Sequence, residues 1–223
     1  LVSNKSLTKL NTAFIAFPMQ ITSVRLTRQP TEARQIEIVL AALRLAKDDS
    51  PAFITTTHLA EAVGVSQGAL FKHFESKEAI WLAVLSWVSE NLLRTLQEAA
   101  EQGATPTESL RRVYEAHVNF VVAHPGVPRV IFHELQQPDD SPLKKQVRSL
   151  MLAYRRLLSG LLALAVQRKE LTADLDQSAA ATLFMGIVQG LVMQSMLGGD
   201  MANMKTQADA IFESYLRGMR TPS

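Results

Sequence analysis

Residues 55–77 read TTTHLAEAVGVSQGALFKHFESK and carry the most informative pattern of the sequence. Its apolar residues have the spacing of a small core shared by two short helices: Leu59, Val63, Val65, Leu70 and Phe74. Gly64 lies where the chain must reverse direction, a position that favours positive φ. Thr55 or Thr56 can cap the first short helix, and Ser66 can cap the second. The pattern predicts a helix-turn-helix whose second helix is presented rather than buried.

The second short helix carries side chains suited to a DNA groove. Gln67 can read a base edge through two hydrogen bonds, and the small Gly68 and Ala69 let the backbone approach the major groove. Three further side chains suit phosphate contacts, which position a protein on DNA and make its affinity fall with salt: Lys72, His73 and Lys77. The same turn also occurs in helical bundles that bind no nucleic acid, so the spacing alone leaves both interpretations open.

The rest of the chain shows helical periodicity and turn signals, with no alternating strand pattern and no internal repeat. Ser76 and Asp176 can each cap a long helix, and residues 105–108 read as a capping box with proline at the first helical position. The other predicted helices span about residues 33–47, 76–101, 105–123, 127–136, 141–169, 176–199 and 204–218. The predicted fold class is all-α, with three short helices followed by about six longer ones.

Composition and charge exclude several kinds of site. The sequence has no cysteine, which excludes a disulfide scaffold, a thiolate metal site and a cysteine nucleophile, and which fits a reducing cytosol. Residues 1–28 carry four basic residues and no acid, so they form a predicted N-terminal extension that either touches phosphate or remains a solvated tail. Their apolar stretch, residues 13–19, is short and broken by Pro18, which argues against a secretory signal. Met19 is a candidate natural start.

Residues 32–82, about 50 in all, resemble the N-terminal domain of the TetR/AcrR family of bacterial transcriptional regulators. The elements that carry the resemblance share the family's spacings: Ile36 to Ala42 in the first helix, Thr55-Thr56, Leu59-Ala60, Val63-Gly64-Val65-Ser66, Leu70-Phe71, His73-Phe74 and Ser76-Lys77-Glu78. The resemblance implies a cytoplasmic repressor that binds double-stranded DNA and releases its operator when a small molecule binds the C-terminal domain. The DNA-facing positions that we predict are Thr56, Thr57, Gln67, Gly68, Ala69, Phe71, Lys72, His73 and Lys77.

The chain departs from the family pattern at places that concern DNA contact. Most relatives have tyrosine at the position of Phe71, which lacks the hydroxyl that meets phosphate. Ala69 stands where threonine or serine is common, and it is therefore a candidate for contact with a thymine methyl group. The turn after the first helix, residues 49–52, lacks the usual glycine. Because residues 25–80 hold seven bases and seven acids, binding is expected to depend on a few well-placed contacts.

Residues 177–199 carry no charge and include two glycines four residues apart, which allow close contact between helices. A membrane-spanning helix is the rival interpretation, because about 20 apolar residues can span a bilayer. Gln189, Gln194 and Ser195 argue against it, as does the lack of flanking Lys or Arg. We therefore expect this helix and the last one to form a homodimer interface, with no membrane partner. The predicted interface residues are Leu183, Gly186, Ile187, Gly190, Leu191, Ile211 and Tyr215.

Two domains are expected, a DNA-binding domain over residues 29–78 and a helical ligand-binding and dimerisation domain over residues 79–223. Because residues 82–223 hold 14 bases and 14 acids, the overall charge does not demand a strongly charged ligand. The candidate lining residues are Tyr114, His117, Phe120, Phe132, His133, Tyr154, Phe184, Met185 and Met193. Each of these has a structural alternative, because Phe and Met at helical spacing also simply fill a core. Tyr114 and His117, one helical turn apart, are the predicted polar pair.

The sequence does not favour an enzyme. His133-Glu134 lacks the second histidine of a HExxH metal site, and His117 and His124 are too far apart on their helix to share one zinc ion. We find no glycine-rich phosphate loop and no nucleophile motif, so no catalytic residue, metal or cofactor is expected. The leading hypothesis is a ligand-responsive repressor that reads a palindrome as a homodimer. The alternatives are a DNA-bound protein that regulates a partner protein without an inducer, and a helical binding module without DNA function.

Overall fold

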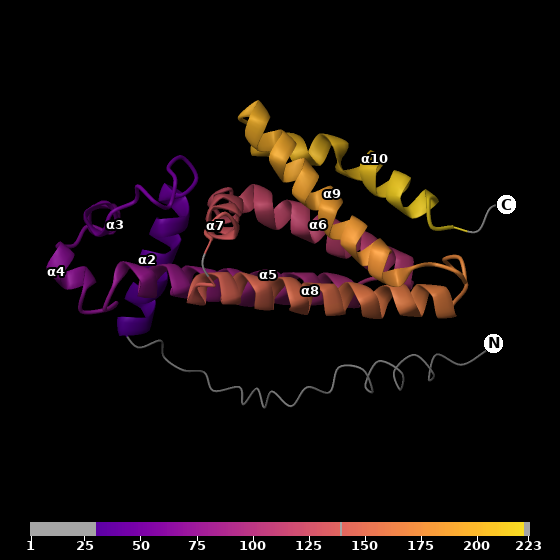
Figure 1. Cartoon of the computed structure of the whole chain (residues 1–223), viewed down its shortest axis with the longest axis horizontal. Coiled ribbons are helices and arrows are strands. Elements are labelled where there is room, and N and C mark those ends of the chain that lie inside the picture. Colours follow the sequence, from indigo (N-terminus) through magenta and orange to yellow (C-terminus); the bar gives the residue numbers. More distant parts are fainter. Residues whose placement is uncertain (1–29, 139, 221–223) are drawn as a thin grey trace. The chain divides into compact units, whose positions relative to one another are not determined.

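The computed structural model describes residues 30–138 and 140–220, so the expected N-terminal extension over residues 1–28 and the candidate start Met19 lie outside the described residues. Within the described ranges the chain forms nine α-helices, one 3-10 turn and no strand, which confirms the all-α fold class. The helices are α2 Pro30–Leu45, α3 Thr56–Ala62, α4 Gln67–Leu70, α5 Lys77–Glu101, α6 Pro106–Ala123, α7 Gly126–Leu135, α8 Pro142–Gln167, α9 Gln177–Gly198 and α10 Met204–Arg217, with η1 Met201–Asn203 between the last two (Figure 1).

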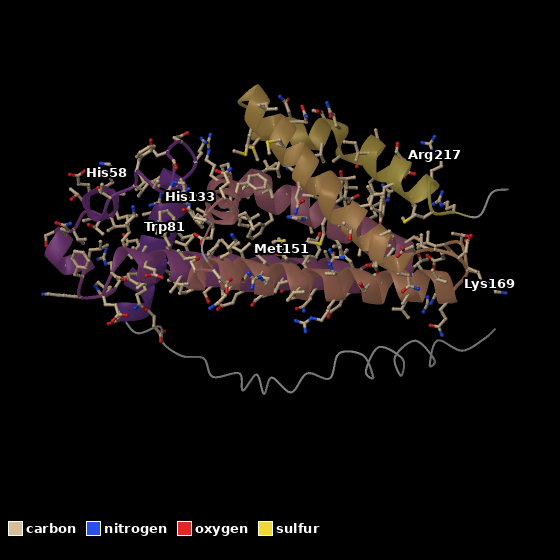
Figure 2. All side chains as sticks on the ribbon, viewed as in Figure 1. His58, Trp81, His133, Met151, Lys169 and Arg217 are labelled. Carbon is tan, nitrogen blue, oxygen red and sulfur yellow. The ribbon has the colours of Figure 1, made fainter. Side chains whose placement is uncertain are left out.

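The apolar core is built around α5. This helix packs against α6 and α8, while α8 also contacts α9, and α10 lies on α6 and α9 (Figure 1). Apolar residues recur every four positions along α5 and are buried: Val84, Val88, Leu92 and Leu96. Figure 2 shows side chains filling the space between the long helices, with Met151 of α8 labelled among them. One continuous core therefore runs from Ile38 in α2 to Met219 just after α10.

Two helices, α8 and α9, are long and apolar enough to cross a membrane by length and composition alone. Both pack within the helical body, where Tyr154 and Leu158 of α8 and Phe184 and Val188 of α9 are buried. α8 also carries five basic residues. Of the most apolar window of each helix, 28% is buried in α8 and 44% in α9, so packing within the described chain accounts for only part of their apolar composition.

Side-chain caps explain where six of the helices begin. At each start, the residue before the first helical turn accepts a hydrogen bond from the backbone N–H three residues later, which satisfies a donor that the helix itself leaves free. The six capping residues are Thr55, Ser66, Ser76, Thr105, Ser141 and Asp176. Each of these helix starts could be predicted from the sequence, because Ser, Thr and Asp are residue types that commonly cap helices.

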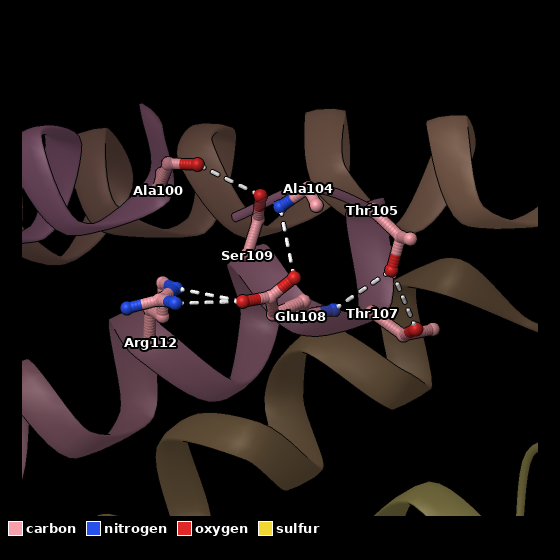
Figure 3. Close-up of polar contacts among 7 residues, drawn as sticks. All are labelled: Ala100, Ala104, Thr105, Thr107, Glu108, Ser109 and Arg112. Atoms are coloured by element: carbon pink, nitrogen blue, oxygen red, sulfur yellow. Dashed lines mark hydrogen bonds and ion pairs between the residues drawn. The ribbon is translucent and has the colours of Figure 1, made fainter. Parts of the chain in front are cut away.

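The capping box predicted at residues 105–108 forms only in part. Thr105 accepts the backbone N–H of Glu108 at 3.2 Å, as predicted. The Glu108 carboxylate, however, accepts the N–H of Ala104 at 2.9 Å instead of that of Thr105 (Figure 3). Arg112 holds the same carboxylate at 2.7 Å, and this hydrogen bond is the main reason that the pKa of Glu108 is lowered. The reciprocal bond is therefore displaced by one residue.

The turn between α5 and α6 is closed by Ser109, whose hydroxyl donates to the carbonyl of Ala100 at 2.7 Å (Figure 3). A Cβ on Gly103 would lie 2.4 Å from the Ser109 Oγ and 2.5 Å from its backbone nitrogen. Glycine at residue 103 is therefore required by the close approach of α6.

We expect Ser109→Ala to lower the free energy of unfolding by about 1 kcal/mol, because it removes the 2.7 Å hydrogen bond to the half-buried Ala100 carbonyl, which then keeps, among the described residues, only a 3.4 Å bond from the Gly103 N–H. Urea unfolding of the variant measures the loss. The matched control is Ser149→Ala on the exposed face of α8, which should change the free energy little. An equal effect in the two variants would contradict this role for Ser109.

The start of α7 is pressed against the end of α2. A Cβ on Gly126 would lie 2.0 Å from the Leu43 carbonyl oxygen and 3.1 Å from the Lys47 nitrogen. No flexible side chain separates the two backbones at this point. A displacement of α7 toward α2 would therefore also move α2, the helix against which the helix-turn-helix packs.

Candidate nucleic-acid interface and ligand cavity

α3 and α4 form the predicted helix-turn-helix. Gly64 has φ of +69°, the left-handed conformation predicted for it. The turn is closed by a hydrogen bond of 2.9 Å from the Val65 N–H to the Ala60 carbonyl. Leu59 and Leu70 are fully buried between the two helices and α2. α4 is short, Gln67–Leu70, and its outer side faces solvent.

The predicted DNA-facing residues divide into two groups. The exposed group comprises Thr57, Gln67, Gly68, Phe71 and Lys72. The half-buried group comprises Thr56, Ala69, His73 and Lys77. Sequence reasoning missed Phe53 in the loop before α3, which is 76% exposed and lies beside this surface along the chain. Its signal was weak, because a single aromatic residue in a loop has no periodicity.

Gln67 and Thr56 are joined across the motif, since the Gln67 Nε2 donates to the Thr56 Oγ1 at 2.6 Å. This hydrogen bond holds the Gln67 amide in one orientation on the exposed side of α4. A side chain fixed before binding loses less conformational entropy when it meets a base edge.

The backbone of His73 and the side chain of Lys77 contact neighbouring parts of the chain, and the His73 Nδ1 is buried. The backbone carbonyl of His73 accepts a hydrogen bond from Gln35 Nε2 of α2 at 3.0 Å. Lys77 Nζ donates to the Ala52 carbonyl at 3.2 Å, and partial burial lowers the pKa of this ammonium group. These contacts fix the helix-turn-helix to α2 and α5, and neither was accessible from sequence, because they join residues 25 or more positions apart.

A cavity of about 70 Å³, here called the central cavity, lies among α5, α6, α7, α8 and α9. Five of the nine predicted ligand residues line it: His117, Phe120, Phe132, Tyr154 and Met185. The lining residues that sequence reasoning missed are Leu92, Val121, Val127, Pro128, Ile131, Leu135, Met151, Val188, Gln189 and Val192. Most of these are aliphatic, and sequence gives no signal that separates a cavity wall from a packed core.

The other four predicted ligand residues lie elsewhere. Tyr114 and Phe184 are fully buried, with ring centroids 5.9 Å apart in an edge-to-face pair, and belong to the aromatic core beneath α10. His133 lines a different cavity, and Met193 is on the exposed side of α9.

The polar pair in the central cavity is His117 with Tyr154, and the expected pairing of His117 with Tyr114 is not formed. His117 Nδ1 lies 3.1 Å from the Tyr154 hydroxyl. The Tyr114 hydroxyl is buried without a hydrogen-bond partner in the described part of the chain, and burial raises its pKa to about 12. Burial lowers the pKa of His117 to about 4, so the imidazole is neutral at pH 7. The true partner is 37 residues away on α8, beyond the reach of helical spacing.

The predicted dimer residues are also divided. Leu183, Gly186 and Gly190 face outward on α9, where Leu183 is 54% exposed. A Cβ on either glycine meets no atom of residues 30–138 and 140–220 within 4 Å, so packing among these residues does not require the glycines. Ile187 and Ile211 are half-buried. Leu191 and Tyr215 pack inside the chain, and the Tyr215 hydroxyl donates to the Ala180 carbonyl at 3.1 Å.

Two family models match this chain. The model described as "Bacterial regulatory proteins, tetR family" matches residues 38–84, which cover the helix-turn-helix and the start of α5. The model described as "Tetracyclin repressor-like, C-terminal domain" matches residues 134–211. The chain belongs to the TetR family. It is therefore a DNA-binding transcriptional regulator of a non-enzymatic family.

Individual relatives of this TetR-family regulator are distant. It is 24% identical to the nucleoid occlusion factor SlmA of Shewanella pealeana over 159 residues, which cover 71% of this chain and 81% of SlmA. The structure of FadR from Bacillus subtilis in complex with stearoyl-CoA is similar with a TM-score of 0.73 and 19% identity, and the match covers 83% of this chain and 99% of FadR. The structure of the ketosteroid regulator KstR2 of Mycobacterium tuberculosis is similar with a TM-score of 0.71 and 18% identity, and the match covers 85% of this chain and 96% of KstR2. These structural likenesses concern the fold alone.

Proposed function

We propose that this TetR-family regulator is a cytoplasmic repressor that binds a palindromic operator as a homodimer and is released by a small apolar effector. Residues 29–78 would read DNA, and residues 79–223 would dimerise and hold the effector. The observation that carries the proposal is the pair of exposed side chains Gln67 of α4 and Lys72 of the turn after it, in a fold that also has an apolar cavity. Two copies of α4 about one helical turn of DNA apart, roughly 34–36 Å, would read the two half-sites.

The outer face of α9 supports the homodimer. Its exposed apolar residues include Leu197, which is 77% exposed, as well as Leu183 and Met193. A contiguous apolar face of this kind on a DNA-binding protein is typical of an interface between copies. The outward glycines at 186 and 190 would let the two α9 helices approach closely.

The lining of the central cavity supports an uncharged effector. None of its lining residues carries a charge at neutral pH, because His117 is neutral there. Burial of an unpaired charge is costly, whereas His117 and Tyr154 offer hydrogen bonds to a carbonyl or hydroxyl. The cavity is smaller than the roughly 300 Å³ of ordinary ligand sites, so the effector must enlarge it. FadR was crystallised with stearoyl-CoA, whose long acyl chain is apolar although its coenzyme A part is strongly anionic, so the likeness supports the apolar part of the effector alone.

The route from effector to DNA would pass through α7. This helix lines the central cavity with Val127, Ile131 and Phe132, and its first residue, Gly126, touches the backbone of α2. An effector that enlarges the cavity pushes α7, and α7 shifts α2 together with the helix-turn-helix. Release requires that the effector bind the shifted state more tightly than the DNA-competent state.

The test begins with selection of bound duplexes from a random pool. Three probes with the same chain are then titrated against the operator complex: methyl decanoate, decanoate and decylamine. We expect the neutral ester to release the operator at a concentration about tenfold lower or more than either charged probe. The proposal is wrong if no palindrome is selected, or if the charged probes act as well as the ester.

A second candidate function is DNA-bound regulation of a partner protein without an inducer. The similarity to SlmA, a nucleoid occlusion factor by name, favours it. This alternative is favoured over the effector-released repressor if the operator complex remains intact with every apolar probe. The ester should then also leave the Tm of the complex unchanged.

The neutral state of His117 predicts a loss of stability at acid pH. The unfolded chain takes up a proton on this histidine below about pH 6.5, while the folded chain resists protonation down to a pKa of about 4. The free energy of unfolding should therefore fall as pH decreases, by about 1.5 kcal/mol from this residue between pH 6.5 and 5. The Gln variant, His117→Gln, keeps a polar partner for Tyr154 and does not titrate. Urea unfolding at the two pH values should show a smaller loss for the variant, and an identical loss would contradict the assignment.

Lys72 is exposed on the surface that would meet the phosphate backbone. We expect Lys72→Ala to weaken binding to every duplex by a similar factor, and to reduce the slope of log affinity against log salt by about one. Fluorescence anisotropy across a salt series measures both. The matched control, Lys145→Ala on α8, is far from this motif in sequence and exposed, and it should leave the slope unchanged. An unchanged slope for Lys72→Ala would exclude the phosphate contact.

A further inference from the structure

A second cavity of about 160 Å³, here called the junction cavity, lies between the loop after α2 and helices α5, α7 and α8. It is lined by Pro51, Ala52, Lys77, Trp81, Leu85, Val130, His133, Glu134 and Leu143, and it shares none of them with the central cavity. The labelled Trp81 and His133 lie close together in Figure 2. Because a cavity of about 150 Å³ can hold benzene, there is room here for a ligand body of that size.

The junction cavity contains two opposite charges that do not pair with each other. Glu134 is only 6% exposed, and its carboxylate accepts a hydrogen bond from the Ser141 hydroxyl. Among the described residues no cation forms an ion pair with it. Lys77 donates one hydrogen bond to the Ala52 carbonyl and likewise forms no ion pair in the described ranges. A buried carboxylate without a cation is costly to the fold, and a ligand can remove that cost.

Apart from His133, whose Nε2 lies 3.4 Å from Gln137 Nε2, the side chains that line the rest of the junction cavity are apolar. Trp81, Leu85 and Leu143 come from α5 and α8 and form the wall on which a hydrophobic body could pack. A complementary ligand therefore has a negative group for Lys77, a positive group for Glu134 and a small apolar body. This charge pattern differs from that of the central cavity, whose lining is uncharged.

We propose that the junction cavity is a second binding site, for a small zwitterion of the amino-acid type with a short apolar side chain. The carboxylate of the ligand pairs with Lys77, and its ammonium group pairs with Glu134. The apolar side chain lies against Trp81 and Leu143. One bound ligand would then provide an ion-pair partner for both Lys77 and Glu134.

α7 separates the two cavities and couples them. It turns Val130, His133 and Glu134 toward the junction cavity, and Val127, Ile131 and Phe132 toward the central one. An effector that enlarges the central cavity pushes α7 toward the junction cavity, and a ligand there resists this displacement. The two ligands therefore weaken each other's binding, by equal factors. If the proposed function holds, on which this last step rests, the zwitterion opposes release of the operator.

The binding experiment uses the full chain and three matched sets of probes: the amino acids L-valine, L-leucine and L-isoleucine, the acid 4-methylpentanoate, which is leucine without its ammonium group, and the amine 3-methylbutylamine, which is leucine without its carboxylate. At millimolar concentration, at least one amino acid should raise Tm, and neither truncated probe should do so. Calorimetric titration should show affinity reduced about tenfold or more in Glu134→Gln. The Gln side chain still accepts from Ser141, so the fold is expected to persist.

A second variant keeps the proposal falsifiable if Glu134→Gln is unstable. Leu143→Phe adds apolar volume to the same cavity, and this variant should fold yet bind none of the amino acids. The site is disproved if no amino acid binds the wild-type chain, or if one binds both variants as tightly as the wild type.

The coupling is measured with methyl decanoate in the absence of DNA. A saturating amino acid should raise the Kd of the ester about fivefold or more, and an unchanged Kd overturns the opposition through α7. The separate operator-release assay decides the proposed function. If the ester fails to release the operator there, the proposed function fails, while the amino-acid titration still decides the site.

Discussion

Replacing Gly190 with glutamate is expected to convert the homodimer into a monomer and to weaken operator binding about a hundredfold or more. A Cβ at residue 190 meets no atom of the described part of the chain within 4 Å, so the fold of one chain is expected to tolerate the side chain. In the proposed dimer the same position faces a second α9, where a carboxylate would be buried without a partner. The two half-sites would then be bound independently, and the gain from linking them would be lost.

Sedimentation equilibrium measures the association, and fluorescence anisotropy with the selected operator measures the affinity. The control is Ser149→Glu, which adds the same charge to the exposed face of α8. We expect this control to remain dimeric and to bind as the wild type does. A dimeric Gly190→Glu variant would show that the α9 face is not the interface.

The second large effect is expected for Gly126→Ala. The added Cβ would lie 2.0 Å from the Leu43 carbonyl oxygen, a backbone atom that can move only if α2 or α7 moves. We expect the free energy of unfolding to fall by about 3 kcal/mol, the upper part of the range for overpacking. Because the strain is relieved by separation of α7 from α2, operator affinity should fall as well.

Urea unfolding and operator anisotropy measure the two effects. Gly160→Ala is the matched control, since residue 160 lies inside α8 and an added Cβ meets no atom of the described residues within 4 Å. This control should gain up to about 1 kcal/mol from helix propensity. If Gly126→Ala is as stable as its control and binds the operator normally, α7 does not press on α2 in the way described.

The boundaries of the helices could be predicted because local chemistry sets them. Thr55, Ser66 and Ser76 cap helices in the structure as their residue types suggested, and Gly64 adopts the predicted positive φ. The capping box at residues 105–108 was wrong in one detail, the reciprocal bond of Glu108, because a carboxylate on a flexible side chain can reach either of two neighbouring N–H groups.

The candidate sites were predicted less completely, because they depend on contacts between distant helices. Tyr154 meets His117 from 37 residues away, so a search for polar neighbours on one helix selected Tyr114 instead. Lys77 carried the charge expected of a phosphate contact, yet its ammonium group donates to Ala52 and lines the junction cavity. Such placements follow from how α5, α7 and α8 pack, and no spacing along the chain encodes them.

The proposed function depends most on the entry of α4 into a groove of the double helix. Binding of the wild type and of Gln67→Ala to the selected operator, and to its single-base variants at low ionic strength, tests this most directly. We expect salt-sensitive wild-type binding, and a loss of discrimination by Gln67→Ala at one or two base positions, each by about 1–3 kcal/mol. Absence of wild-type binding to any duplex, or a base preference unchanged in Gln67→Ala, would contradict it.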